Sequence, residues 1–295
     1  MPKSSVNATA RGPLLFSLAM LISGSIGLFV RLIDLSPINI VFFRCAFGAI
    51  ALGIYVLSFK RDSMRIPRSE LVPILGCGLV LVANWVFLFA AFKQTSITVA
   101  VSIYYLAPVL VTLYGLLFLG QKGTKAVVFG ILLAFLGAAL VSGITVEDIL
   151  ALNILGASYA FCAAVLYAAL ILLSKRVKHT DSAVIALVQT TIGTLILSFF
   201  ADFDIAFVNL NWGFIVAIGA VHTALLYILF FRGIRDSPIL LVALLGFIDP
   251  LFAIFLDRFA LGNEISAVQV IGIACIVLAL TLKALSEQKT EPLTE

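Results

Sequence analysis

The sequence contains very little charge. Only 12% of its 295 residues are Asp, Glu, Lys or Arg, whereas 62% are hydrophobic, and a soluble domain carries about 25% charged and about 45–50% apolar residues. This composition argues against a soluble enzyme, a nucleic-acid-binding protein and a disordered protein, all of which need a charged surface. It is typical of an integral membrane protein, whose partner is the lipid bilayer.

Histidine and cysteine are also scarce, and familiar catalytic motifs are missing. The two histidines and four cysteines form no C-x-x-C pair and no zinc-ligand spacing, so we expect neither a metal nor any other cofactor. Each cysteine lies in a different apolar segment, where a free thiol behaves as a small buried hydrophobe. The G-x-S-x-G, H-E-x-x-H, G-x-G-x-x-G and P-loop patterns are absent. The sequence therefore predicts that the protein is not an enzyme.

What the sequence has instead is a series of long apolar segments. A membrane-spanning helix needs about 20 mostly apolar residues, and segments of this kind alternate with short loops. The ten predicted spans are 13–31, 37–59, 71–92, 97–119, 126–144, 153–173, 182–200, 212–232, 238–259 and 266–285. The predicted fold class is therefore all-α integral membrane, with ten transmembrane helices.

The basic residues are concentrated on one side of these spans. When the N-terminus is placed in the cytoplasm, 15 of the 19 Lys and Arg residues fall on the inner side, three fall on the outer side, and Arg44 lies inside the second span. Such a bias in short loops follows the positive-inside rule. We therefore expect a bacterial inner membrane protein with both termini in the cytoplasm. The net charge of +4 then calls for no nucleic-acid partner.

The second half of the sequence matches the first when the two are laid over each other. Pro108 then coincides with Pro250, and Gly120 coincides with Gly262; both pairs have the same spacing, which we call the repeat distance. Each half holds five spans, an odd number, so the halves would cross the membrane in opposite directions. The two predicted inverted repeats are residues 1–147 and 148–295. This architecture is typical of secondary transporters, whose substrate site lies near the membrane midplane between the repeats.

Short motifs follow one another in the same order through both halves. They are Phe43-Arg44, the run from Ala91 to Ser96, Pro108 and the run from Leu119 to Lys122, and then the run from Arg235 to Pro238, Pro250, the run from Leu261 to Ser266 and the run from Gln269 to Gly272. In these motifs the chain resembles the EamA-type members of the drug/metabolite transporter superfamily. The resemblance implies a carrier of small metabolites that works by alternating access without ATP, and an amino-acid or metabolite exporter is the common bacterial role. An organic-cation or drug exporter of the same fold is one alternative, and a polytopic membrane enzyme is another.

Ionisable residues inside the spans mark a candidate site, because charge at membrane depth is costly and usually faces a cavity or a partner. Asp249 precedes Pro250, which leaves backbone carbonyls free; the acid either binds a cation or coupling proton, or pairs with a neighbouring helix. Arg44 either binds a carboxylate or phosphate in a forked geometry or ties helices together. His222 titrates near neutral pH, so it either carries a coupling proton or bonds to a neighbouring helix.

Aromatic and amide side chains complete the candidate site. Trp85 and Tyr227 are separated by the repeat distance, so symmetry would place both beside the cavity if one of them lines it. Tyr104 is a further aromatic candidate, and the alternative for all three is lipid contact or packing. Asn84 and Gln189 contact either the substrate or a neighbouring helix.

The charges of these interior residues suggest a substrate. The spans offer one cation, Arg44, and one anion, Asp249, which together suit a zwitterion such as an amino acid. Aromatic side chains would add cation–π contact with its ammonium group. An organic cation held by Asp249 and aromatic rings is the second choice.

Overall fold

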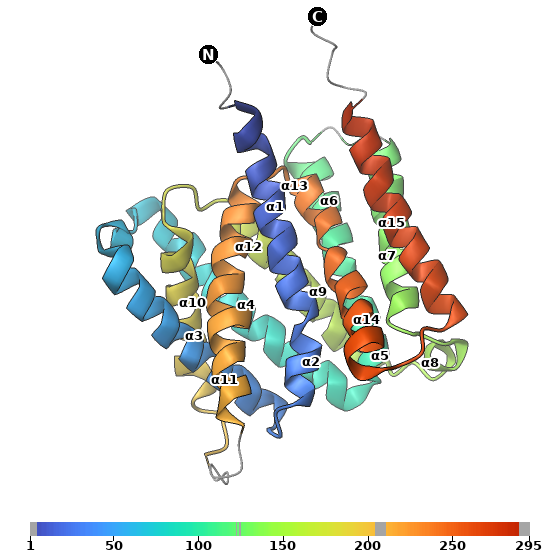
Figure 1. Ribbon diagram of the computed structural model, residues 1–295, viewed down its shortest axis with the longest axis horizontal. Helices are drawn as coiled ribbons and strands as arrows, with labels where there is room; N and C mark the ends of the chain where they lie inside the picture. The colour runs from blue at the N-terminus through green and yellow to red at the C-terminus, as the bar shows by residue number, and fades with distance from the viewer. Residues whose placement is uncertain (1–4, 122, 124, 204–210, 289–295) are drawn as a thin grey trace, which may run out of the picture.

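The protein is a bundle of helices (Figure 1). The computed structural model describes residues 5–121, 123, 125–203 and 211–288, and this part of the chain contains no β-strand. Seven of its helical segments are long and apolar enough to cross a membrane, and three shorter apolar helices, Val127–Val141, Ser182–Leu197 and Ala267–Leu282, accompany them. The chain is therefore a multi-span membrane protein. Lys122 lies outside the described residues, as do the first residues of the first predicted repeat (1–4) and the last residues of the second (289–295).

Short connections join the helices in chain order. The helices are α1 (Ser5–Gly24), α2 (Ile26–Arg31), α3 (Pro37–Phe59), η1 (Arg61–Met64), α4 (Arg68–Gln94), α5 (Ile97–Tyr104), α6 (Leu106–Phe118), α7 (Lys125–Val141), α8 (Val146–Leu150), α9 (Ile154–Ser174), α10 (Ser182–Leu197), α11 (Trp212–Gly219), η3 (Ala220–Leu225), α12 (Leu226–Arg235), α13 (Ile239–Leu245), α14 (Ile248–Leu261) and α15 (Ala267–Gln288). Of these, η1 is a 3-10 helix and η3 is a π-helix.

Three of the predicted spans are interrupted near their middle. The break between α5 and α6 falls at Tyr105, shortly before Pro108, and the break between α13 and α14 falls at Gly246 and Phe247, shortly before Pro250. Because proline donates no backbone hydrogen bond and clashes with the preceding turn, it weakens the helix on its N-terminal side. The break between α1 and α2, at Ser25, has no such proline.

The main helix pairs each join one helix of the first half of the chain to one helix of the second half. α4 packs along α9, and the helices that the repeat distance relates to these two, α12 and α1, pack along each other as well. α3 packs on α10, and α7 packs on α15. At the α7–α15 contact a Cβ added to Gly137 would lie 2.6 Å from the carbonyl oxygen of Gly272, and one added to Gly272 would lie 2.6 Å from that of Gly137. Glycine is thus required for this close approach.

The start of α1 and the end of α15 lie at the same end of the bundle, which we call the terminal end (Figure 1). The connections after α3, α9 and α12 meet there. Lys60 forms an ion pair with Asp181, with 3.2 Å between Nζ and Oδ2, and Lys175 Nζ donates to the carbonyl oxygens of Ile234 and Arg235. Loops rich in basic residues are therefore gathered at the terminal end.

Candidate functional site

Arg44 lies in the interior, where α3 meets the π-helix η3. Its Nε donates to Oγ1 of Thr223 at 2.9 Å, and its Nη2 donates to the carbonyl oxygen of His222 at 3.0 Å. The guanidinium also lies over the ring of Trp85, 5.4 Å from the ring centroid. A π-helical turn departs from the regular i−4 ladder and is often found at functional sites; here it supplies the carbonyl that accepts from Arg44. Among the described residues Arg44 has no ion-pair partner.

Asp249 lies in the first turn of α14, just after the break in that span. Ser23 on α1 hydrogen-bonds its side chain. α1 approaches α14 closely here, since a Cβ added to Gly24 would be 2.5 Å from the carbonyl oxygen of Asp249. The side chain keeps some accessible surface although it lies deep between helices. No cation pairs with Asp249 in the part of the chain that the structure describes.

Tyr104 lies near both of these charged groups. Its hydroxyl interacts electrostatically with both Asp249 and Arg44, donates to Oδ1 of Asn84 at 3.4 Å, and its ring stacks on Tyr167 with centroids 5.3 Å apart. Tyr104 thus lies within electrostatic range of both the cation and the anion.

Tyr227 completes the group on the Arg44 side. It is 6% exposed on α12, and Trp85 is 8% exposed on α4; Tyr227 interacts electrostatically with Arg44. The two aromatic residues related by the repeat distance therefore both lie next to Arg44. We call Arg44, Trp85, Tyr104, Tyr227 and Asp249 the central cluster.

His222 lies at the border of the central cluster and bonds to a neighbouring helix. Its Nε2 is 2.8 Å from the hydroxyl of Ser25, at the break between α1 and α2, and its ring lies 4.3 Å from that of Phe29. Since the hydroxyl of Ser25 also donates to the carbonyl of Ile22, it accepts from Nε2 of His222. The imidazole of His222 thus joins η3 to the break in the first span. The backbone carbonyl of the same residue accepts from Arg44.

The two amides have different positions. Asn84 is fully buried; its Nδ2 donates to the carbonyl of Ala163 at 2.6 Å while its Oδ1 accepts from Tyr104. Gln189, also fully buried, donates to the carbonyl of Cys77 at 3.1 Å. Cys77 is two turns, or about 10 Å, from Asn84 along α4. The structure thus joins Asn84 to the central cluster and gives Gln189 a helix-to-helix bond away from it.

Several residues of the site have no clear signal in the sequence. Tyr105 and Tyr167 both interact electrostatically with Asp249, and Ser23 bonds it. Thr223 holds Arg44. These are common residues in apolar segments, and only the packing of α1, α6, α9 and η3 around one centre distinguishes them from lipid-facing neighbours.

Comparison with known proteins shows that most of the chain is similar to membrane transporters. The sequence model of the EamA-like transporter family matches residues 10–143 and again residues 154–284. The uncharacterized transporter YxxF of Bacillus subtilis is 35% identical over 277 residues, which are 92% of this chain and 88% of that protein. An uncharacterized transporter of Archaeoglobus fulgidus is 25% identical over 262 residues, covering 88% of this chain and 91% of that one. A protein of known crystal structure shares the fold, with a TM-score of 0.80 and 20% identity over 94% of this chain and 98% of its own.

Proposed function

The chain belongs to the EamA-like transporter family, and from this membership we propose that it exports an amino acid or an amino-acid-derived metabolite by alternating access. In this proposal the central cluster is the substrate site. Arg44 binds the carboxylate, Asp249 binds the ammonium group, and Trp85, Tyr104 and Tyr227 contact the side chain. Asp249 is also the group that takes up a coupling proton.

One observation carries the substrate class: a cation and an anion lie in the interior without an ion-pair partner among the described residues. A charge at membrane depth is costly unless something compensates it. Arg44 is held by one hydroxyl, one carbonyl and one aromatic ring, and Asp249 by one hydroxyl. A zwitterion would supply both missing counter-charges at once. A multiply charged anion would need more interior cations than Arg44.

The transport mechanism rests on ten helices arranged as two inverted repeats. Three features support it: the family model matches each half of the chain, helix pairs related by the repeat distance join the two halves, and the breaks at Tyr105 and Phe247 are separated by the repeat distance. Broken helices at a repeat interface are the usual place for a transporter's substrate site. Rocking of one repeat against the other would then expose the central cluster to either side.

The orientation follows from the basic loops. They meet at the terminal end together with the start of α1 and the end of α15, and the positive-inside rule assigns such an end to the cytoplasm. In this proposal the protein lies in the cell membrane of a bacterium, and export runs from the terminal end to the opposite end.

An organic-cation exporter is the second candidate. It is favoured by the three tyrosines, Tyr104, Tyr105 and Tyr167, that lie within electrostatic range of Asp249. A carboxylate surrounded by aromatic rings can bind a cation that has no carboxylate of its own.

Counterflow in liposomes tests the substrate class. Purified protein is reconstituted with a panel of amino acids inside, and uptake of the labelled counterpart is measured against three competitors: the amino acid, its methyl ester and its decarboxylated amine. We expect the amino acid to compete. The methyl ester and the amine should both compete poorly, because both lack the carboxylate that Arg44 would bind. Undiminished competition by the amine would remove Arg44 from the site and favour the organic-cation exporter.

Two variants connect the result to the site. Asp249→Asn should fold and insert but lose counterflow, because the ammonium group loses its counter-charge. Asp34→Asn is the matched control, since Asp34 is an exposed carboxylate near the end of α2. Full transport by Asp249→Asn with an unchanged pH response would show that the acid is structural.

A further inference from the structure

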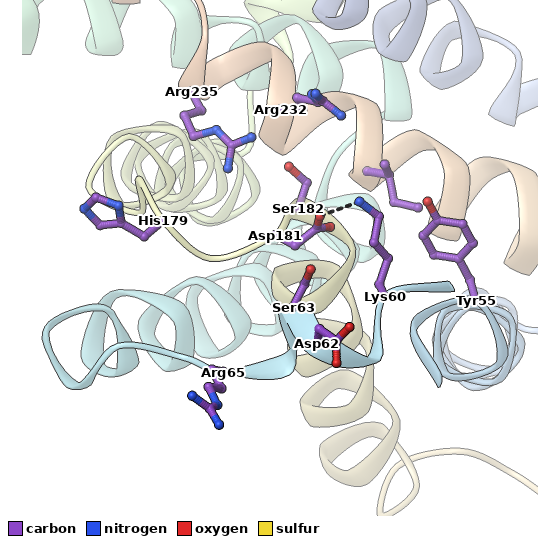
Figure 2. A pocket seen from close by; sticks show the side chains of 11 residues that line it. Tyr55, Lys60, Asp62, Ser63, Arg65, His179, Asp181, Ser182, Arg232 and Arg235 are labelled. Carbon is purple, nitrogen blue, oxygen red and sulfur yellow. Dashed lines mark ion pairs between the residues drawn. The ribbon is translucent and has the colours of Figure 1, made fainter. Parts of the chain in front are cut away.

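A second polar site lies at the terminal end of the bundle, apart from the central cluster. A pocket of about 400 Å³ opens there between the connection after α3, the start of α10 and the end of α12. Figure 2 shows its side chains converging from these three elements. Lys60 directly follows the end of α3, about 24 Å along a helix from Arg44, so the basic end of this pocket lies far from Arg44, although Ile228, which also lines the pocket, directly follows Tyr227.

Cations dominate the lining of the pocket. Four of its side chains are basic and two are acidic, namely Lys60, Arg65, Arg232 and Arg235 against Asp62 and Asp181. One of the acids is paired, because Asp181 Oδ2 lies 3.2 Å from Nζ of Lys60. The pocket therefore attracts an anion.

Two polar atoms of the lining are buried and have no hydrogen-bond partner among the described residues. One is the hydroxyl oxygen of Ser182, a residue that is only 3% exposed. The other is Nε of Arg232; its nearest carboxylate oxygen, on Asp236, is 4.0 Å away, which is too far for a hydrogen bond. Buried polar groups are normally satisfied. A hydroxyl and a guanidinium N–H that both lack hydrogen-bond partners in one pocket point to an absent acceptor.

The flank of the pocket is apolar and faces outward. Tyr55 lines the pocket and is 37% exposed, and the neighbouring Phe59 is 76% exposed, with the two rings 5.8 Å apart. On a membrane protein such exposed aromatic residues face lipid. Basic pockets at this depth are typical sites for acidic lipid head groups.

We propose that this pocket binds a phosphate group, carried either by an anionic lipid head group or by a small soluble phosphate. Arg232 and Ser182 donate to its oxygens, and the excess of positive over negative side chains in the lining balances its charge. The site goes beyond the proposed transport function and does not depend on it.

Calorimetric titration of the detergent-purified protein tests the site. Three probes are compared: dihexanoyl phosphatidylglycerol, dihexanoyl phosphatidylcholine and inorganic phosphate. We expect phosphatidylglycerol to bind and phosphatidylcholine to bind far more weakly. Binding of inorganic phosphate in the same pocket would identify a soluble anion as a ligand, and its failure to bind would identify the lipid head group; both results keep the phosphate site.

Four variants locate the binding. Arg232→Gln should raise the Kd about tenfold or more, because it removes a charge-assisted hydrogen bond, and Ser182→Ala should raise it by a smaller factor without disturbing the fold. Asp62→Asn should lower the Kd, because it removes a negative charge from the lining. Arg176→Gln, which takes a positive charge from an exposed position at the same end, should leave it unchanged.

Three results would overturn the proposal, and circular dichroism checks the fold of each variant. They are absence of binding by both phosphatidylglycerol and inorganic phosphate, equal binding of phosphatidylcholine, and a loss with Arg176→Gln as large as with Arg232→Gln. None of these readouts involves transport, so they leave the proposed function untouched.

Discussion

Replacing Glu70 by Gln should release the connection between α9 and α10. The carboxylate of Glu70 accepts from the backbone N–H of Lys178 (2.8 Å), His179 (2.9 Å) and Thr180 (2.9 Å), and from the hydroxyl of Thr180 (2.7 Å). Glu70 is only 4% exposed. One side chain on α4 thus satisfies three consecutive backbone donors of a loop that would otherwise lack partners.

The size of the effect follows from these bonds. Glutamine keeps one acceptor oxygen, so the bonds from Lys178 and His179 change from charge-assisted to neutral, at a cost of about 1 kcal/mol each. The amide NH₂ then faces the N–H of Thr180, and a buried unsatisfied donor costs about 1–3 kcal/mol. The total of about 3–5 kcal/mol corresponds to a factor of at least about 100 in local opening.

Amide hydrogen exchange of the loop peptide measures this opening. In Glu70→Gln we expect residues 178–180 to lose at least about 100-fold of their protection, while the middle of α4 keeps its own. Glu147→Gln is the control, because Glu147 is exposed on α8. Protection within twofold of the original protein would refute the conclusion that Glu70 holds the loop.

Two further predictions concern helix packing and a helix cap. Gly137→Ala should lower the melting temperature, because its Cβ would lie 2.6 Å from the carbonyl oxygen of Gly272 and overpacking costs about 1–3 kcal/mol. Gly53→Ala is the control, because its Cβ would meet nothing within 4 Å and should leave the melting temperature unchanged. Equal melting temperatures of the two variants would contradict the close contact. Bonds from the backbone and hydroxyl of Thr145, and from the hydroxyl of Ser96, lower the pKa of Asp148 below its ordinary 3.8. A lowered pKa means that the cap of α8 contributes fully near neutral pH and is lost only as the pH falls through the folded value, below about pH 4. The amide chemical shift of Thr145 against pH reports this loss, and a transition at or above pH 4 would contradict it.

Composition and periodicity predicted the general architecture because the bilayer imposes it. Apolar segments of span length and the distribution of Lys and Arg indicated a multi-span membrane protein, which the structure and the family both confirm. Proline also carried information, since two of the breaks fall shortly before Pro108 and Pro250. The break at Ser25 and the π-helix at Ala220–Leu225 had no such signal, because they depend on how neighbouring helices pack.

The residues of the site were predictable to the extent that they are unusual in a membrane. Arg44 and Asp249 stood out as interior charges, and the repeat distance related Trp85 to Tyr227. Tyr167 could not be singled out in this way, because nothing in the sequence of α9 shows which of its faces meets Tyr104. The sequence does not indicate the pocket at the terminal end either, because its cations come from connections that are far apart in the sequence.

The two interior charges break the symmetry of the proposed repeats, and in the proposed function this asymmetry provides the two counter-charges of a zwitterion. The repeat distance relates Arg44 to Ala186 and Asp249 to Ala107, and both alanines are fully buried. An exact repeat would instead place two arginines or two aspartates near the axis that relates the halves, where like charges repel and raise the cost of burial. With one charge from each half, the first repeat supplies the cation and the second supplies the anion. Neither half alone then offers both counter-charges, and a substrate that carries both would hold the two repeats together.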